Sequence, residues 1–204
     1  MKNKKTTEAY LTQKETPVLD AVFMGMVVVG VILIAVWTFF YVGFGFFGLP
    51  LAIIGGLGVV LLRSAKVTDE EFDADVKRIL TNCGIEENDS TLKEYIVGKS
   101  EHIKPGKDKR IRTAFYCVTV FSFKKDICTV KKHVIDLFAE SVSTHEYSVG
   151  VGCKCNLTEK EYQTGIGAIS RSFLEVEGEP EINVPVNVNV YDTEAVIKRL
   201  THKR

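Results

Sequence analysis

The sequence predicts an α-helical transmembrane hairpin followed by an α+β domain, in which an antiparallel meander of strands packs against a C-terminal helix. Three observations predict this fold class. Between Pro17 and Leu62 only Asp20 is charged, and a bilayer core of about 30 Å needs about 20 apolar residues in one helix. This stretch of 46 residues therefore suits two spans. From residue 113 onward apolar positions recur at the spacing of strands, and the last residues return to helical spacing.

The hairpin is expected to occupy residues 17–66, after an N-terminal tail of residues 1–16. Asp20 falls in the first turn of the first span, where the helix dipole favours a carboxylate and the headgroup region hydrates it. Charge is distributed unevenly around the two spans. The connection between them is uncharged, whereas the tail and the outer flanks carry basic residues. All the basic residues near the spans lie outside the connection: Lys2, Lys4, Lys5, Lys14, Arg63 and Lys66. The positive-inside rule then predicts a multi-pass protein of the plasma membrane with both termini in the cytoplasm.

A stripe of small residues marks the second span. Gly48, Ala52 and Gly56 recur at intervals of four, and small residues at this spacing let two helices approach closely. We favour packing against the first span of the same chain. The same stripe also suits a homo-oligomer, and with it a role as an oligomeric transporter accessory.

Composition narrows the classes of partner. The chain has 26 basic and 26 acidic residues, and from Arg63 onward it has 22 and 23. A nucleic-acid-binding domain needs a basic face to neutralise phosphates, so the balance argues against such a partner. The five cysteines are odd in number and loosely spaced, which does not suggest a disulfide framework and agrees with a reducing compartment.

The soluble domain is expected to be cytoplasmic and to cover residues 67–204. Its predicted parts are a helical preface at 67–98, a basic loop at 99–112, antiparallel strands at 113–191 and a final helix at 192–204. The preface combines a helix that Gly84 ends with a second short helix near Ser90–Val97. Four acids crowd the first turns of the first helix, where the dipole favours them, and we interpret them as a helix start rather than a metal site: Asp69, Glu70, Glu71 and Asp73.

The strand region has two distinctive segments. Residues 115–123 are apolar on both faces, which is typical of a central strand. Lys124-Lys125-Asp126 forms a polar turn before the returning strand. Near the C-terminus valines alternate with asparagines through residues 183–190, and Pro185 places this strand at an edge, an end or a bulge.

Basic residues supply the candidate binding site. A run in the basic loop and the pair in the strand turn are candidates for contacting a protein partner or anionic lipid headgroups: Lys104, Lys107, Lys109, Arg110, Arg112, Lys124 and Lys125. Near an anionic leaflet such residues contribute about 1 kcal/mol each. For the run in the basic loop we favour a solvated loop over a lipid contact.

The order of hairpin, acid-rich helix, strands and short final helix resembles small two-pass bacterial membrane proteins of unknown function. The strand run with its last helix also resembles a pleckstrin-homology-type domain. In lipid-binding members of that fold, basic residues on and after the first strand turn grip phosphates. The resemblance therefore implies that Lys124 and Lys125, followed by Lys131 and Lys132, face anionic headgroups.

No sequence motif predicts catalysis or a cofactor, so we expect a non-enzymatic binding or scaffold protein anchored in the membrane. The alternative is a membrane-anchored metal-binding sensor or enzyme. Its four ligands would be Cys153, Cys155, His133 and His145, at a spacing less regular than that of structural zinc sites.

Overall fold

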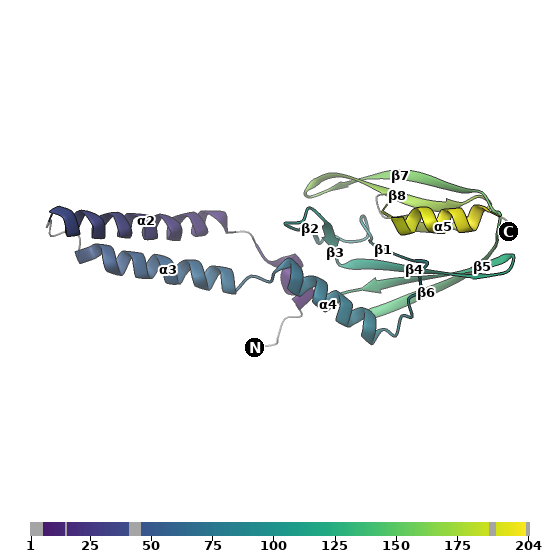
Figure 1. The fold of residues 1–204 in the computed structure, drawn as a ribbon, viewed down its shortest axis with the longest axis horizontal. Coiled ribbons are helices and arrows are strands. Elements are labelled where there is room, and N and C mark those ends of the chain that lie inside the picture. The colour runs from purple at the N-terminus through teal and green to yellow at the C-terminus, as the bar shows by residue number, and fades with distance from the viewer. Residues whose placement is uncertain (1–5, 15, 41–45, 188–190, 203–204) are drawn as a thin grey trace. The chain divides into compact units, whose positions relative to one another are not determined.

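The computed structural model describes residues 6–14, 16–40, 46–187 and 191–202. The chain divides into two compact units (Figure 1). One is helical and covers Gln13–Thr68, and the other combines Met1–Thr12 with Asp69–Arg204.

The helical unit contains α2 (Pro17–Phe40) and α3 (Gly48–Ser64). Helix α2 is long and apolar enough to span a membrane, and α3 is so when counted together with the residues up to Asn82. Their bounds lie within two residues of those expected at Pro17 and Lys66. The uncharged connection falls largely on residues 41–45, which lie outside the described residues.

Glycines bring α2 and α3 into close contact. A Cβ on Gly30 would lie 2.6 Å from the backbone N of Ala52, and one on Gly55 would lie 2.7 Å from the carbonyl O of Phe23. Gly48 also packs against α2, whereas a Cβ on Gly56 would meet nothing within 4 Å. A helix repeats every 3.6 residues, so each step of four drifts by about 40° around the axis. Within the hairpin the third contact position is therefore Gly55, and Gly56 faces outward.

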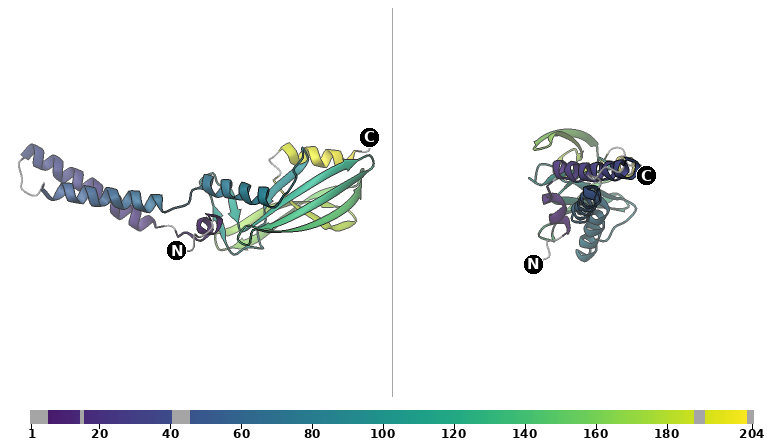
Figure 2. Two further views of the ribbon diagram at one scale, coloured as in Figure 1. Left: turned by 90° about the horizontal axis from the view of Figure 1, so that it is seen from below. Right: turned by 90° about the vertical axis from the view of Figure 1, so that its left-hand side faces the viewer.

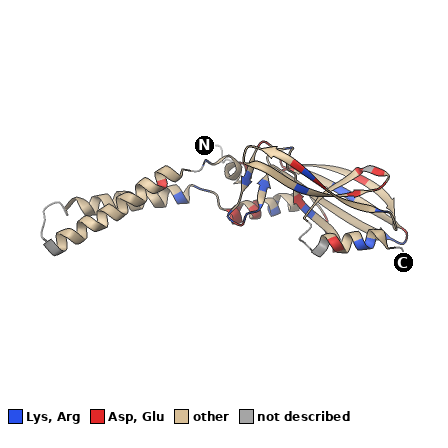
Figure 3. Cartoon of the chain, turned by 90° about the horizontal axis from the view of Figure 1, so that it is seen from above, with Lys and Arg blue, Asp and Glu red and all other residues tan. Residues whose placement is uncertain are grey.

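Polar contacts join the start of α2 and the residues before it to the residues that follow α3. Lys66 Nζ lies 3.4 Å from Asp20 Oδ2. The Gln13 side chain donates to the Val67 carbonyl at 3.1 Å and accepts from the Val67 N–H at 2.9 Å. Figure 3 shows the charged residues of the hairpin at this end alone, within its described part. Asp20, expected to be hydrated by headgroups, thus has a cation as its partner.

The second unit contains nine strands and three helices among the described residues. The strands are β1 (Thr91–Tyr95), β2 (Ile103–Pro105), β3 (Ile111–Thr113), β4 (Phe115–Lys124), β5 (Ile127–Asp136), β6 (Ser141–Gly150), β7 (Cys155–Thr164), β8 (Gly167–Val176) and β9 (Glu179–Val186). The helices are α1 (Thr6–Thr12), α4 (Asp69–Asn82) and α5 (Tyr191–Thr201). The antiparallel strands followed by a C-terminal helix confirm the predicted element order.

The strands form two sheets and a hairpin. One sheet has the order β1-β4-β5-β6, the other has the order β7-β8-β9, and β2 pairs with β3 between β1 and β4 in the chain. β4 lies between two strands, as the apolar residues on both its faces predict. Pro185 lies on β9, an edge strand among those described, which is one of the positions that its missing N–H predicts.

Three expectations about this unit are wrong. The second short helix near Ser90–Val97 is instead strand β1, in which Leu92 is buried and Lys93 exposed, the alternation of a half-buried strand. The basic loop at 99–112 contains the β2–β3 hairpin. Residues 6–12 of the expected tail form α1, whose Tyr10 is 1% exposed and stacks on Phe72 of α4 with ring centroids 4.6 Å apart.

The core lies between the two sheets. Side chains from both sheets and from α5 form one buried cluster: Leu92, Phe121, Cys128, Val130, Val149, Leu174, Val176, Ile182, Val184, Val186, Val196 and Leu200. Figures 1 and 2 show α5 alongside the strands and α4 on the other side of the four-stranded sheet. The apolar stripe of α4, Phe72, Val76 and Ile79, is buried there. Strand β4 of the four-stranded sheet is thus buried on both faces, whereas β6 is exposed along most of its length.

Candidate anion-binding groove

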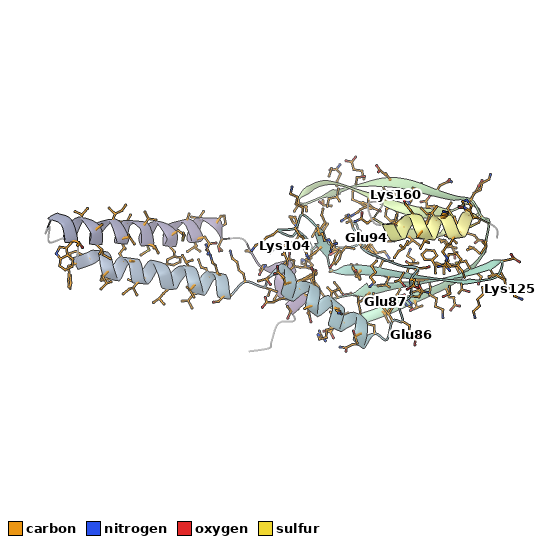
Figure 4. The ribbon with its side chains drawn as sticks, in the orientation of Figure 1. Glu86, Glu87, Glu94, Lys104, Lys125 and Lys160 are labelled. Carbon is orange, nitrogen blue, oxygen red and sulfur yellow. The ribbon has the colours of Figure 1, made fainter. Side chains whose placement is uncertain are left out.

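The candidate basic residues do not form one surface. Figure 4 shows Lys104 and Lys125 at opposite ends of the sheet unit. Lys124 and Lys125 lie in the β4–β5 turn, where Lys125 has a φ of 50°. Residues 104–112 belong to the β2–β3 hairpin at the other end. The two groups therefore do not form a single binding surface.

The tip of the β2–β3 hairpin presents three cations to solvent. The Gly106 N–H donates to the Arg110 carbonyl at 2.8 Å and the Lys109 N–H donates to the Gly106 carbonyl at 3.0 Å, which closes the turn. Lys109 has a φ of 64°. Lys107, Lys109 and Arg110 are all exposed. This hairpin tip, residues 106–110, concentrates positive charge because its one acid, Asp108, is paired within the domain.

Arg112 is the partner of Asp108 and is itself buried, with 1% of its surface exposed. Its Nη1 and Nη2 donate to the two oxygens of Asp108 at 2.9 and 3.0 Å, and its Nε and Nη2 donate to Asp73 at 3.0 and 2.7 Å. The hydrogen bonds to Asp73 raise the pKa of Arg112 above its ordinary value. Arg112 therefore has no exposed surface for a headgroup, contrary to the expectation that the whole run faces a ligand. It fixes the hairpin to α4.

Two further contacts fix the same junction. Asp69 at the start of α4 accepts the Tyr10 hydroxyl at 2.7 Å and the Lys107 N–H at 2.7 Å. Burial opposes ionisation of Asp69, but these hydrogen bonds outweigh it and lower the pKa of that carboxyl. The Lys104 ammonium lies 4.6 Å above the Tyr10 ring. Lys104 thus contacts α1, whereas the side chains of Lys107, Lys109 and Arg110 in the hairpin tip are exposed to solvent.

A groove of about 700 Å³ opens beside the hairpin tip. Its walls are the edge strand β1, the tip, β8, and the start of the segment from β9 to α5: Thr91, Leu92, Lys93, Glu94, Tyr95, Lys109, Arg110, Ile111, Tyr116, Ala168, Ile169, Ser170, Arg171, Val186, Asn187 and Thr193. Four of these residues are basic and one is acidic. The groove therefore favours an anion.

The charges in the groove are not equally available. Lys93 Nζ lies 2.5 Å from Glu87, so its charge is already balanced. Glu94 accepts the N–H of Tyr95 at 2.9 Å. In contrast, the Nε of Arg171 is buried and has no hydrogen-bond partner among the described residues. A buried donor without an acceptor costs about 1–3 kcal/mol, a cost that an acceptor brought to Arg171 would remove.

Two tyrosines form part of the groove wall. The rings of Tyr95 and Tyr116 meet edge to face with centroids 4.7 Å apart. Burial raises the pKa of both hydroxyls above the ordinary value of 10.0, so both remain neutral at physiological pH. Neutral hydroxyls do not repel an anion. The site can therefore hold an oxyanion by guanidinium and ammonium groups, and guanidinium matches phosphate geometry with two parallel hydrogen bonds.

The sequence-based prediction missed Arg171 and Lys93 because it relied on runs of basic residues. Arg171 stands between Ile169 and Phe173 at the period of a strand, and both neighbours are buried. An arginine on the inward face of a strand is the signal that would have found it.

The alternative metal site is not assembled. The sulfur atoms of Cys153 and Cys155 lie 3.8 Å apart. His133 pairs across the ladder with Thr144 while His145 pairs with Lys132, so the two imidazoles point to opposite faces of the sheet. Across the described part of the chain no three His, Cys, Asp or Glu side chains are placed to hold a metal ion. The four-ligand hypothesis was wrong because spacing on two strands does not reveal which face each residue occupies.

Comparison with protein-family models, with curated proteins and with solved structures gives no match to this chain.

Proposed function

We propose that this protein is a non-enzymatic, membrane-anchored binding domain whose groove and hairpin tip bind the phosphate of an anionic lipid headgroup. The observation that carries the proposal is the buried, unpartnered Nε of Arg171 in the wall of a groove that also receives Lys109 and Arg110. A phosphate oxygen accepts from that donor, and the two residues at the mouth hold the remaining charge.

The anchor favours a lipid as the source of the phosphate. In this proposal α2 and α3 cross the plasma membrane and both termini lie in the cytoplasm, where the leaflet is anionic. Only residues 65–68 separate the end of α3 from the start of α4. At about 3.5 Å per residue, this connection keeps the start of α4 close to the membrane surface. In this proposal the hairpin tip, which Asp69 and Asp73 of α4 hold, reaches the headgroups.

A pleckstrin-homology-type arrangement is part of the proposal. It is supported by four antiparallel strands, then three, then a terminal helix, in that chain order. With β1 as the first strand, the segment between β1 and β4 takes the place from which basic residues grip phosphates in that fold. This segment carries Lys107, Lys109 and Arg110, whereas Lys124 and Lys125 belong to the next turn.

Two lysines with positive φ allow a matched test. Lys109→Asn and Lys125→Asn each remove one exposed charge from a turn whose left-handed backbone asparagine tolerates. Full-length protein is placed in nanodiscs of phosphatidylcholine with or without phosphatidylglycerol, and hydrogen exchange is measured in residues 91–95 and 106–111. We expect the anionic lipid to slow exchange in both segments, less so at high salt.

We expect Lys109→Asn to weaken this protection and Lys125→Asn to leave it unchanged. Equal exchange in the two lipid compositions would contradict headgroup binding. An equal effect of the two substitutions would instead assign the protection to general charge attraction and contradict the groove as the site.

A further inference from the structure

A second, smaller pocket of about 240 Å³ lies between the sheets and shares no lining residue with the groove. Its walls come from the segment after β1, from β5 and from all three strands of the other sheet: Ile96, Val97, Gly98, Lys99, Lys132, Val134, Tyr162, Phe173, Asn183 and Pro185. Two of these residues are lysines, and none of the described lining residues is acidic.

Lys132 lies on the inward face of β5. Cys128 and Val130 precede it at the period of the strand and belong to the core, and Val134 follows on the same face. The Lys132 ammonium donates to the carbonyl of Asn183 on β9. An ammonium group has three donors, and this bond uses one. Lys132 therefore brings a charge and spare donors into the interior, beside apolar neighbours on its own strand face.

The surroundings leave that charge without a counter-charge. Within the described part of the chain, neither Lys99 nor Lys132 forms an ion pair. Glu175, the carboxylate that bonds the Asn183 side chain at 3.0 Å, is shared with Lys160 at 2.9 Å. Burial lowers the pKa of Lys132, and the charges of Lys99 and Lys160 lower it further. An anion in the pocket would reverse these effects.

The remaining walls are apolar and the space is small. Val97, Val134 and Pro185 are aliphatic, and the Tyr162 and Phe173 rings stand with centroids 6.3 Å apart. The volume falls below the 300–1,000 Å³ of ordinary ligand pockets, which favours a small ligand. Apolar walls give an inorganic anion no contacts, whereas they bury the hydrocarbon part of an organic acid.

We propose that this pocket binds a small organic carboxylate. Its carboxylate group accepts hydrogen bonds from Lys132 and Lys99, and its hydrocarbon part packs against Val97, Val134 and Phe173. The site shares no lining residue with the groove. The class of ligand that fits it is a cytoplasmic metabolite with one carboxylate and a compact branched or aromatic body.

Competitive labelling of lysines tests the proposal on the full-length protein in uncharged detergent micelles. Trace acetylation with acetic anhydride is followed for each lysine by mass spectrometry. The probes are benzoate and isovalerate, and the controls are their neutral amides at equal concentration. We expect the carboxylates, but not the amides, to slow acetylation of Lys132 several-fold and to leave the exposed Lys125 unchanged.

Two variants and two further anions distinguish binding of a carboxylate in this pocket from other causes of protection. Lys132→Met should abolish any thermal stabilisation by benzoate. Lys99→Met, which leaves the interior intact, should weaken the protection of Lys132. Equal labelling with carboxylates and amides would overturn the proposal. So would protection by inorganic phosphate, or by nanodiscs containing anionic lipid, without protection by benzoate or isovalerate.

Discussion

The guanidinium of Arg112 grips the carboxylate of Asp73 with two hydrogen bonds, Nε to Oδ1 at 3.0 Å and Nη2 to Oδ2 at 2.7 Å. The two residues are 39 positions apart. Arg112 is 1% exposed, whereas the Asp73 side chain is 47% exposed. The pair joins the β2–β3 hairpin to α4, and through it the hairpin tip is held beside the groove.

Replacing Arg112 with lysine should destabilise the sheet unit. Lysine keeps the charge but lacks the planar fork that serves Asp73 and Asp108 together. Hydrogen bonds to charged groups contribute about 1.5–3 kcal/mol each, so we expect Arg112→Lys to lower the free energy of unfolding by about 2 kcal/mol. The urea dependence of thiol labelling at the buried Cys128, resolved by mass spectrometry, measures this change.

Arg110→Lys is the control for this substitution. Arg110 lies two positions away on the same hairpin but is exposed, and exposed substitutions usually change stability by less than about 0.5 kcal/mol. If both substitutions shifted the unfolding of Cys128 equally, the buried pair would not be what holds the hairpin.

Local patterns predicted much of this fold. The apolar stretch predicted the two long helices, and the segment that is apolar on both faces predicted the central strand β4. The polar residues Lys124–Asp126 predicted the turn after it. Each of these features depends on neighbours in the sequence. The short strand β1 was missed because five residues are too few to separate a strand from a helical turn by periodicity.

The candidate site was less predictable because it depends on contacts between distant segments. The acids of α4 and the basic run each suit a solvated segment when considered alone. Only the fold shows that Asp73 and Asp108 remove Arg112 from the surface, while Lys109 and Arg110 stay exposed. Arg171 joins them from β8, about 60 residues later, and no local pattern links the three.

Adjacent glycines in α3 predict opposite effects of alanine. Gly55→Ala places a Cβ 2.7 Å from the Phe23 carbonyl O, so the helices must separate, and we expect a loss of about 1–3 kcal/mol from overpacking. Gly56→Ala meets nothing within 4 Å and should be neutral or slightly stabilising, because alanine favours helix. Trp37 on α2 is the only tryptophan, so its emission during an SDS titration follows the hairpin. Equal midpoints for the two variants would contradict the close contact at Gly55.

Alkaline pH should weaken the sheet unit through its buried thiols. Burial, with a smaller contribution from Cys153, raises the pKa of Cys128 from 9.0 to about 11. Between these values the unfolded chain releases a proton that the native state keeps, so the free energy of unfolding falls as pH rises through this interval and is unaffected below it.

We expect the urea midpoint, followed by the circular dichroism of the strands, to fall between about pH 8 and pH 10. Cys128→Ala should make this fall smaller, while Cys117 and Cys155, whose pKa values burial also raises, maintain the rest. Val130→Ala removes core volume from the same face of β5 without a titrating group, so it should lower the midpoint at both pH values equally. A fall as large in Cys128→Ala as in the unsubstituted protein would show that this thiol does not contribute.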